Sequence, residues 1–488
     1  MPCMSISMWR FRGARSQCAG ASRARLAVTV LLSASACSSS TPNPDPGPGP
    51  SATTDGGTPA TDSSPPNNTG AGSLVTVVAN GPGRITSTPA GIDCGGGGTA
   101  CSAAFAEPSV TLATDDATTV RWSGDCSGNG SCAVALGTDR TIAAETFAPL
   151  RLTFDDPDRL ADSCNAIAAG PGDAILVTGQ YGNIAQGHDA WTRAYDAAGA
   201  VLWTYRLSTP SEGHDLGAGL VALPDGGAAV AGTWFSGSNS HWNGFVLDVG
   251  ATGASAWSDL SEEVGDDMNL AIARDAAGGL YVAGSQADGT ASLRALSADG
   301  RSEAWSVSRS GTGAGHAAAT GVAVDPLGYV IAVGSETNAD TGVDGWLASY
   351  DASGALRWSM PVASAGTDSM RGVAAGADTI AAIGSVDGAS TIRVYTAAGA
   401  PRWDITAADG TSWGGIALDA AGSVAVTGSI GTDLIVRKYT AGGALIWQRT
   451  VADAHGAAAA FDSHGDLLIC GQATLSGNTD GLVMAFAQ

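Results

Sequence analysis

A seven-fold internal repeat is the feature that most constrains how this chain of 488 residues can fold. A short β-forming segment ending in glycine recurs at intervals of 43 to 53 residues. A small turn such as DAAGA or DASGA, followed by tryptophan, comes about 20 residues later and occurs six times. The glycines are Gly179, Gly232, Gly284, Gly334, Gly384, Gly428 and Gly471, and the tryptophans are Trp203, Trp257, Trp305, Trp358, Trp403 and Trp447. A β-rich period of this length is typical of a propeller or a solenoid.

Each repeat unit predicts four strands, which we name a to d. Strand a is of the type Gly321–Asp325, strand b ends in the repeated glycine, strand c is of the type Trp346–Asp351, and strand d carries the tryptophan. Tryptophans at one place per unit are expected to fill the wedge between neighbouring sheets. The repeated glycines indicate either a close approach of two backbones or a positive φ.

The chain ends on a strand of type c, so the seventh unit lacks its tryptophan-bearing strand. The segment 149–153 matches 355–359, with Leu152 at the position of Trp358. Pairing of this first strand with the last unit would remove both open edges of an array. We therefore predict an all-β fold, a seven-bladed β-propeller over 149–488 with its ring closed by an N-terminal strand.

The units LASYDASGALRW and VRKYTAGGALIW resemble the β-propeller repeat families of bacterial secreted and surface proteins. They are also similar to the quinoprotein repeat, in which DxxTGxxxW recurs. The quinoprotein threonine is Ala198 or Ser353 here, vicinal cysteines are absent, and seven units are fewer than the usual eight. These departures argue against a quinone enzyme.

The first 37 residues predict a lipoprotein signal peptide. Five arginines precede the apolar run 26–32, and small residues follow it up to Cys37. The run Ala34-Ser35-Ala36-Cys37 resembles the bacterial lipobox, with Ala34 in place of the usual leucine; an ordinary cleaved signal is the alternative. The resemblance implies that Cys37 carries lipid and that the protein is exported and membrane-anchored in the cell envelope, with the outer membrane as the favoured location.

Residues 38–72 hold eight prolines and only three charged side chains. Such a stretch cannot bury apolar area, so a disordered tether is expected there. The formal net charge of the whole chain is −23, with 46 acids and 23 bases. Nucleic acid is excluded as a partner, because its phosphates require patches of lysine and arginine.

Residues 73–148 predict a small β module. Alternating segments separated by Gly, Asp, Asn and Ser turns indicate five short strands. The runs GRITSTPAGIDC and SVTLATDDATTVRWSGDCSGNGSC resemble the divergent internalin B-type repeat of bacterial surface proteins, with Arg121 in place of a glycine. Relatives of this module act as spacers or adhesive units, which implies no catalytic chemistry. Trp122 is expected in its core.

Six cysteines remain after the signal peptide, in an exported and oxidising setting where disulfides persist. Cys94 and Cys101 flank one glycine-rich loop, and Cys126 and Cys132 flank another. Local disulfides are expected, since the gaps do not suit a zinc site. Cys164 and Cys470 are far apart in sequence, but the closed ring would make their blades neighbours. A disulfide between them and two buried thiols both remain open.

The d–a and b–c loops share one face of a propeller, and here they are rich in acids and histidines. We expect these residues to form a rim that either is simply solvated, binds Ca²⁺ through carboxylates, or attracts a cationic partner. Aromatic residues in the b–c loops favour contact with a glycan or peptide. The candidate rim residues are His214, Asp215, Asp266, Asp267, His316, Asp368, His455, Trp234 and Trp242.

Evidence for catalysis is weak. The one GxSxG match, centred on Ser412, lies in a d–a loop before a strand, whereas a nucleophile elbow needs a strand before it and a helix after it. No resident cofactor is expected apart from the calcium candidate. The favoured function is a membrane-anchored binding or scaffold protein that uses the loop-rich face. The alternatives are a propeller enzyme of the lyase, hydrolase or quinoprotein kind, and an outer-membrane assembly scaffold.

Overall fold

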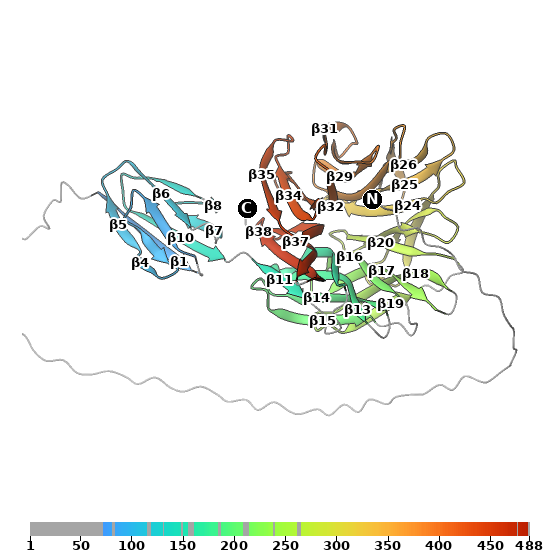
Figure 1. Ribbon diagram of the computed structural model, residues 1–488, viewed down its shortest axis with the longest axis horizontal. Helices are drawn as coiled ribbons and strands as arrows, with labels where there is room; N and C mark the ends of the chain where they lie inside the picture. Colours follow the sequence, from blue (N-terminus) through green and yellow to red (C-terminus); the bar gives the residue numbers. More distant parts are fainter. Residues whose placement is uncertain are drawn as a thin grey trace, which may run out of the picture. The chain divides into compact units, whose positions relative to one another are not determined.

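The computed structural model describes residues 72–80, 83–114, 119–129, 131–147, 150–154, 161–183, 187–207, 214–237, 240–260, 265–475 and 477–486. The predicted signal peptide with Cys37, and all of the tether except residue 72, lie outside the described residues. Strands dominate what is described (Figure 1), and one short 3-10 helix occurs at Pro171–Asp173. No helix among the described residues is long and apolar enough to span a membrane.

The first ten strands form two five-stranded sheets, in the orders β5-β1-β10-β7-β8 and β4-β3-β2-β6-β9. Their core contains Ile85, Leu112, Ile142 and Trp122, and the last is 3% exposed, as expected for a core residue. The strands are β1 (Ser73–Asn80), β2 (Ile85–Thr88), β3 (Asp93–Gly95), β4 (Gly98–Ala100), β5 (Ser102–Phe105), β6 (Ser109–Thr114), β7 (Thr119–Gly124), β8 (Gly128–Asn129), β9 (Cys132–Ala135) and β10 (Arg140–Phe147).

The later strands form seven four-stranded sheets among the described residues, and we call each sheet a blade. Six blades use four consecutive strands, a to d, in sequence order. Blades 1 to 3 contain β12 (Ser163–Ala169), β13 (Ile175–Asn183), β14 (Gly187–Tyr195), β15 (Val201–Leu207); β16 (Asp215–Ala222), β17 (Ala228–Ser236), β18 (His241–Val249), β19 (Ser255–Leu260); and β20 (Met268–Arg274), β21 (Leu280–Ser285), β22 (Ala291–Leu296), β23 (Glu303–Arg309).

The remaining blades continue the same order. Blades 4 to 6 contain β24 (Ala318–Val324), β25 (Val330–Asn338), β26 (Gly342–Tyr350), β27 (Leu356–Val362); β28 (Ser369–Ala375), β29 (Thr379–Val386), β30 (Ala389–Thr396), β31 (Pro401–Thr406); and β32 (Thr411–Leu418), β33 (Val424–Ile430), β34 (Asp433–Tyr439), β35 (Leu445–Val451). Blade 7 contains β36 (Ala454–Phe461), β37 (Leu467–Leu475), β38 (Asn478–Phe486) and, from the start of the propeller, β11 (Arg151–Phe154).

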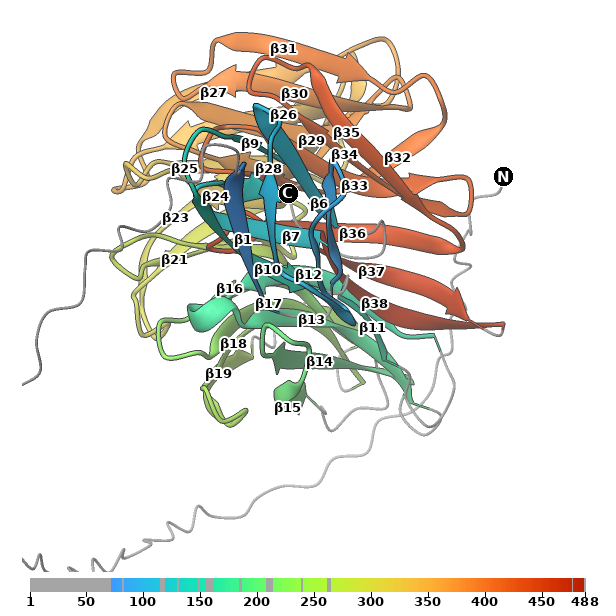
Figure 2. The same ribbon diagram turned by 90° about the vertical axis from the view of Figure 1, so that its left-hand side faces the viewer.

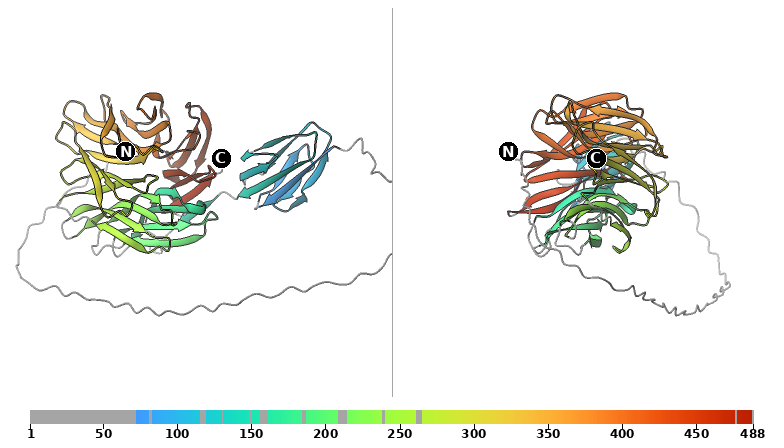
Figure 3. Two further views of the ribbon diagram at one scale, coloured as in Figure 1. Left: turned by 180° about the vertical axis from the view of Figure 1, so that it is seen from behind. Right: turned by 90° about the vertical axis from the view of Figure 1, so that its right-hand side faces the viewer.

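The first strands of neighbouring blades contact one another all the way round, from β12 through β16, β20, β24, β28, β32 and β36 back to β12. Strand a is therefore innermost, and the blades close into a ring. Figure 3 shows the sheets following one another from green to red, until the red strands return to the first blade. The fold is the predicted all-β propeller.

Ring closure is made by β11, which pairs antiparallel with β38 as the outermost strand of the last blade. Figure 2 shows the cyan β11 beside the red β38, although they come from opposite ends of the propeller sequence. Because the two strands exchange backbone hydrogen bonds, β38 is not left as a free edge.

The register of this closing strand differs from the sequence expectation by two residues. The backbone N–H of Ala485 donates to the carbonyl of Leu150, whereas Ala485 stands where Ser349 pairs with Trp358 in blade 4. Leu150, rather than Leu152, therefore occupies the tryptophan position. Matching the shared Leu-Arg pair of the two segments gave the wrong offset. A shift of two keeps every side chain on its face, because strand side chains alternate.

The repeated glycine lies inside strand b, not at its end as predicted. In all seven blades strand a carries a bulge opposite this glycine. A Cβ at Gly284 would lie 1.8 Å from the carbonyl oxygen of Met268, and one at Gly334 would lie 2.0 Å from that of Ala318. Close backbone approach thus explains the repeated glycine, and strand b continues past it.

The second repeat marker is an inter-blade contact. The Trp305 indole N–H donates to the carbonyl of Ala352, which lies in the c–d turn of the next blade. Trp403 makes the equivalent bond to Ala441. The turn glycine has a positive φ, +85° for Gly354, and packs against the ring of Trp305. One contact therefore couples the tryptophan of each such blade to the turn sequence of its neighbour.

Three disulfides are present, Cys94–Cys101, Cys126–Cys132 and Cys164–Cys470, with Cα–Cα distances of 4.6, 6.2 and 5.6 Å. The first two are local to the small module. The third joins β12 of blade 1 to β37 of blade 7 and spans 306 residues of sequence. Of the two alternatives left open by the sequence, the structure has the bonded pair.

Candidate functional site

Two faces of the propeller differ in what they carry. The d–a and b–c connections lie on one face, which we call the loop face, and the a–b and c–d turns lie on the other, the turn face. This follows from the antiparallel order within each blade. The predicted rim residues belong to the loop face, which is therefore the candidate site.

Several loop-face aspartates have a structural role. The carboxylates of Asp162, Asp267 and Asp368 accept the backbone N–H of Gly182, Ala287 and Asp387, at 3.0, 2.8 and 2.9 Å.

In each of these pairs the aspartate lies two residues before the position opposite the repeated glycine, and the donor lies three residues after that glycine. Because the carboxylate holds the start of the b–c connection, it is part of the blade's architecture. Aspartate recurring at this offset was the sequence signal for that role.

The other rim candidates divide by exposure. Asp215 is 1% and Asp368 is 0% exposed, so neither belongs to a solvated rim. Trp234 is 6% exposed and packs between blades 1 and 2, which corrects its assignment as an exposed aromatic. His214, Asp266, His316 and His455 are exposed, and Asp267 and Trp242 are half-buried.

The structure brings together part of the predicted set, in an aromatic patch formed by Phe235, His241, Trp242 and Asp266. The rings of Phe235 and Trp242 meet edge to face, with centroids 5.6 Å apart. Asp266 accepts the backbone N–H of Trp242 at 2.9 Å and lies 3.4 Å from His241 Nδ1. Phe235 lies near the end of β17, His241 and Trp242 lie at the start of β18, and Asp266 lies in the d–a loop that follows blade 2. Phe235 is one of the b–c loop aromatics expected from the sequence to contact a glycan or peptide, whereas His241 was not among the candidates.

A histidine pair lies on the loop face of blades 1 and 2. His188 Nδ1 and His214 Nδ1 are 2.9 Å apart, and the rings stack with centroids 4.9 Å apart. Burial lowers the pKa of His188, and the charge of His214 lowers it further. The contact therefore disfavours a positive charge on His188.

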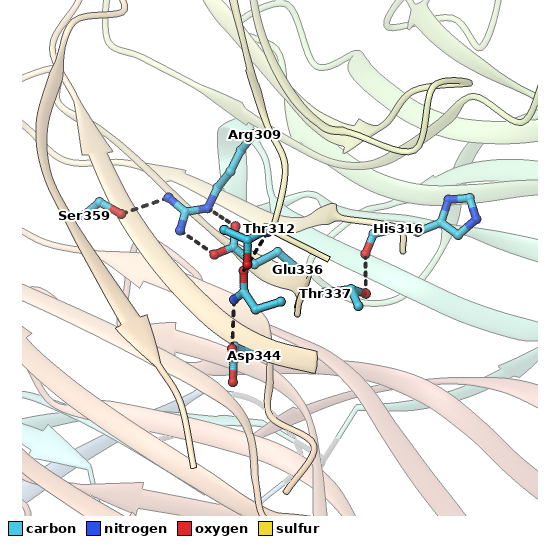
Figure 4. Close-up of polar contacts among 8 residues, drawn as sticks. Arg309, Thr312, His316, Glu336, Thr337, Asp344 and Ser359 are labelled. Atoms are coloured by element: carbon cyan, nitrogen blue, oxygen red, sulfur yellow. Dashed lines mark hydrogen bonds and ion pairs between the residues drawn. The ribbon is translucent and has the colours of Figure 1, made fainter. Parts of the chain in front are cut away.

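The boundary of blades 3 and 4 carries a polar network (Figure 4). Arg309 forms a bidentate ion pair with Glu336, at 2.5 and 2.8 Å, and its guanidinium lies 5.0 Å from the centre of the Trp346 ring. His316 enters the network through its backbone carbonyl, which accepts the Thr337 hydroxyl at 3.2 Å. The His316 ring points away from the network in Figure 4, so the network stabilises the boundary and leaves that ring to solvent.

Among the described residues, the group that could hold a metal ion is Asp173, Asp462 and His464, whose ligand atoms lie within 4.8 Å of one another. It stands on the turn face, where blades 7 and 1 meet, and includes none of the predicted rim residues. His464 Nδ1 already lies 3.1 Å from Asp173 Oδ2, and Asp462 accepts the N–H of His464.

Ser412 lies near the start of β32, a strand, and so has none of the local structure of a nucleophile elbow. It lines a cavity of about 330 Å³ between blades 5 and 6, beside Ser385, Arg371 and Trp413. The described residues that line this cavity include no histidine and no carboxylate. The cavity therefore offers Ser412 no general base.

Comparison with known proteins finds similar structures but no matching family. No family model matches the sequence. No curated protein matches it either. Among solved structures, the chain is similar to the Dos1 propeller, with 10% identity, coverage of 68% of this chain and 93% of that one, and a TM-score of 0.44. It is also similar to the RRP9 WD40 repeats, with 11% identity, coverage of 69% of this chain and 97% of that one, and a TM-score of 0.48.

A third similar structure is the β-propeller domain of the Trilobed protease from Pyrococcus furiosus, described as having an open velcro topology. The identity is 8%, the coverage is 66% of this chain and 93% of that one, and the TM-score is 0.42. At these identities the similarity concerns the fold alone. The four-stranded sheets described above and the ring of contacts between their first strands make the chain a β-propeller protein.

Proposed function

We propose that this chain is an exported, lipid-anchored binding protein, and that its propeller holds a partner on the loop face of blades 1 to 3. The aromatic patch carries this proposal. Phe235 and Trp242 are only half-buried although both are large and apolar, and they stand beside the polar groups of His241 and Asp266. Aromatic rings bordered by hydrogen-bonding groups are typical of surfaces that bind sugars or peptides.

The charge of the patch narrows the class of partner. Asp266 is 59% exposed in its side chain, and the chain as a whole carries a net charge of −23. A neutral glycan or a peptide without excess negative charge suits this surface, whereas a polyanion would be repelled. Many loop-face carboxylates hold their own backbone, so the patch depends on shape and stacking more than on a bound cation.

The anchoring part of the proposal rests on the sequence. Basic residues, a short apolar run and Cys37 occur in the order of a lipoprotein signal, and a proline-rich tether follows. Such a tether would let the small β module and the propeller reach a partner away from the membrane. The outer membrane is the envelope location we favour.

The binding role is tested with residues 72–488 on an array of glycans and in peptide pull-downs. We expect a bound class that is lost in the double variant Phe235→Ala/Trp242→Ala. Leu327→Ala is the control, because Leu327 is 71% exposed on the turn face. No binding to either array, or binding that the double variant leaves unchanged, would overturn the role of the patch.

Anchoring is tested by fractionating cells that express the full chain. The Cys37→Ala variant should move from the membrane fraction to the soluble fraction. Unchanged partitioning would contradict the lipid anchor without bearing on the patch.

A further inference from the structure

A polar cavity of about 330 Å³ lies on the loop face between blades 2 and 3. Its volume is at the lower end of the range for small-molecule sites, about 300–1,000 Å³. The lining residues are Gly244, Asp267, Asn269, Ser285, Gln286, Ala287, Asp288, Ser292 and Arg294. All but Gly244 belong to blade 3 or to the loop that enters it.

The cavity lies where blade 3 has small or polar side chains in place of a bulky apolar one. The residue opposite the repeated glycine in strand c is Trp191, Phe245 and Trp346 in blades 1, 2 and 4. Phe245 packs with blade 1 and Trp346 packs with blade 3, so this side chain fills the wedge toward the preceding blade. In blade 3 the same position is Ser292, and in blade 5 it is Thr391. Blade 5 has the buried Met370 opposite its repeated glycine, where blade 3 has Asn269. The wedge is left open and is lined by polar groups.

The buried end of the cavity presents hydrogen-bond donors. The amide of Asn269 donates to the carbonyl of Phe245 at 3.2 Å and accepts from Arg294 Nη2 at 3.3 Å. That is the polar contact of Arg294 among the residues that the structure describes, and it leaves most of the five guanidinium N–H groups for a ligand. Ser285 is only 9% exposed, and its hydroxyl has no hydrogen-bond partner within the described part of the chain.

Each of these groups can donate a hydrogen bond to an anionic oxygen. A half-buried guanidinium without a carboxylate partner is electrostatically incomplete, and a buried hydroxyl without a hydrogen bond costs about 1–3 kcal/mol. A ligand carboxylate would satisfy both at once, because it accepts two parallel hydrogen bonds from arginine and more from neighbouring donors.

The mouth of the cavity has the opposite charge. Asp267 is half-buried and Asp288 is exposed. Hydrogen bonds from the Thr290 hydroxyl and backbone N–H lower the pKa of Asp288, so it is ionised at neutral pH. The cavity is therefore lined by buried donors and a half-buried positive charge, and by one half-buried and one exposed carboxylate.

We propose that this cavity binds a free α-amino acid, with its carboxylate on Arg294 and Ser285 and its ammonium group at Asp267 and Asp288. A zwitterion matches both ends and has no net charge to be repelled by this acidic protein. Phosphate or sulfate would meet two carboxylates at the mouth. A sugar would lack an aromatic face to stack on, since the described lining has none. The proposal stands independently of the aromatic patch.

The first experiment uses residues 72–488 in isothermal titration and saturation-transfer NMR with glycine, L-alanine, L-glutamine and L-leucine. We expect at least one to bind with a Kd below about 1 mM. Its deaminated acid and its amide should each bind at least ten-fold more weakly, a loss of about 1.4 kcal/mol. No binding at about 10 mM, or equal binding of the deaminated acid, overturns the proposal and leaves a water-filled cavity or a simple carboxylate site.

Two variants locate the site. Arg294→Gln removes the positive charge, and Ser292→Phe fills the wedge with the side chain that blade 2 has at this position. Both should weaken binding at least ten-fold, and Ser292→Phe should keep or raise the melting temperature, because it closes a cavity. Arg371→Gln, in the cavity between blades 5 and 6, is the matched control.

The outcomes are separable. If Arg294→Gln misfolds, the Ser292→Phe variant tests the location of the site. Unchanged amino-acid binding in a folded Ser292→Phe protein overturns the assignment of this cavity as the binding site. The patch variant Phe235→Ala/Trp242→Ala should retain amino-acid binding. Loss of glycan or peptide binding in that variant, with amino-acid binding intact, distinguishes this site from the proposed partner surface.

Discussion

The disulfide between Cys164 and Cys470 should be the largest single contribution to the stability of the ring. It closes a loop of 306 residues, and both cysteines are 0% exposed. The chain-entropy estimate for a loop of this length is about 5–6 kcal/mol, and measured disulfides contribute typically 2–4 kcal/mol. The double variant Cys164→Ala/Cys470→Ala should therefore lose at least about 2 kcal/mol of unfolding free energy, with a further cost for the two small cavities.

Urea unfolding followed by tryptophan fluorescence measures this loss. Reduction of the wild-type protein should bring its midpoint close to that of the double variant, and should leave the variant's propeller transition unchanged. Cys126→Ala/Cys132→Ala is the control, because that disulfide closes a short loop in the small module. An unfolding free energy of the propeller within about 1 kcal/mol of wild type in the double variant would refute the reasoning. It would mean that β11 pairing alone holds the ring.

Three further predictions address closure, the turn glycines and pH. Deleting residues 150–154 should lower the unfolding midpoint and produce concentration-dependent dimers by gel filtration, because β38 becomes a free edge; a monomer of unchanged midpoint would contradict this. Gly354→Ala should cost clearly more stability than Gly328→Ala: both have a positive φ, worth about 1–2 kcal/mol, but only the first places a Cβ 2.7 Å from the Trp305 ring. Equal losses in urea unfolding would count against that contact. The pKa of His188 is lowered from its usual 6.5 in the folded state, so its contribution to stability is present above pH 6.5 and is lost as the pH falls through the folded pKa. The wild-type melting temperature should fall more than that of His188→Asn between pH 7.5 and 5, and parallel curves would rule this out.

The architecture of the propeller could be predicted because the repeat is regular. The glycine and tryptophan markers gave the number of units, and the missing seventh tryptophan gave ring closure. The glycines were expected to mark either a close backbone approach or a positive φ, and their spacing could not decide between the two. Gly334 was taken as the end of a strand, but the bulge that it accommodates belongs to strand a, near Ala318, which carries no marker of its own. The structural reason for a residue can lie on the partner strand, and the spacing of residues in the sequence does not show it.

The register of the closing strand shows a second limit. Leu152 was aligned with Trp358 through shared neighbours in sequence, whereas the structure puts Leu150 there. Hydrogen bonding of the whole strand decides the register, and a two-residue shift leaves the alternation of apolar and polar residues intact. A pattern with period two cannot distinguish the two alignments.

The candidate site was predicted less well, for a reason that applies to repeats in general. Acids in loops suggested a functional rim, but Asp162, Asp267 and Asp368 occupy equivalent positions and make the same backbone hydrogen bond in their own blades. Recurrence at one offset indicates a part of the blade, because every blade meets the same structural need. Loop residues suggest function when they are singular, not when they recur.

That argument also indicates where specific binding arises in this chain. The wedge position holds a bulky ring in blades 1, 2 and 4, and a small polar residue in blades 3 and 5, Ser292 and Thr391. Blade 5 has the buried Met370 beside it, whereas blade 3 has the polar groups of Asn269, Ser285 and Arg294. An open, polar wedge makes the packing of the blade less favourable and brings no structural benefit. Blade 2 has a phenylalanine at the equivalent position. The aromatic patch adjoins it, because the backbone N–H of Asp267 donates to the carbonyl of Trp242 at 2.8 Å. The aromatic patch and the polar cavity thus meet at the boundary of blades 2 and 3. Ligand binding at this boundary would explain why these residues are kept there in place of an apolar filling.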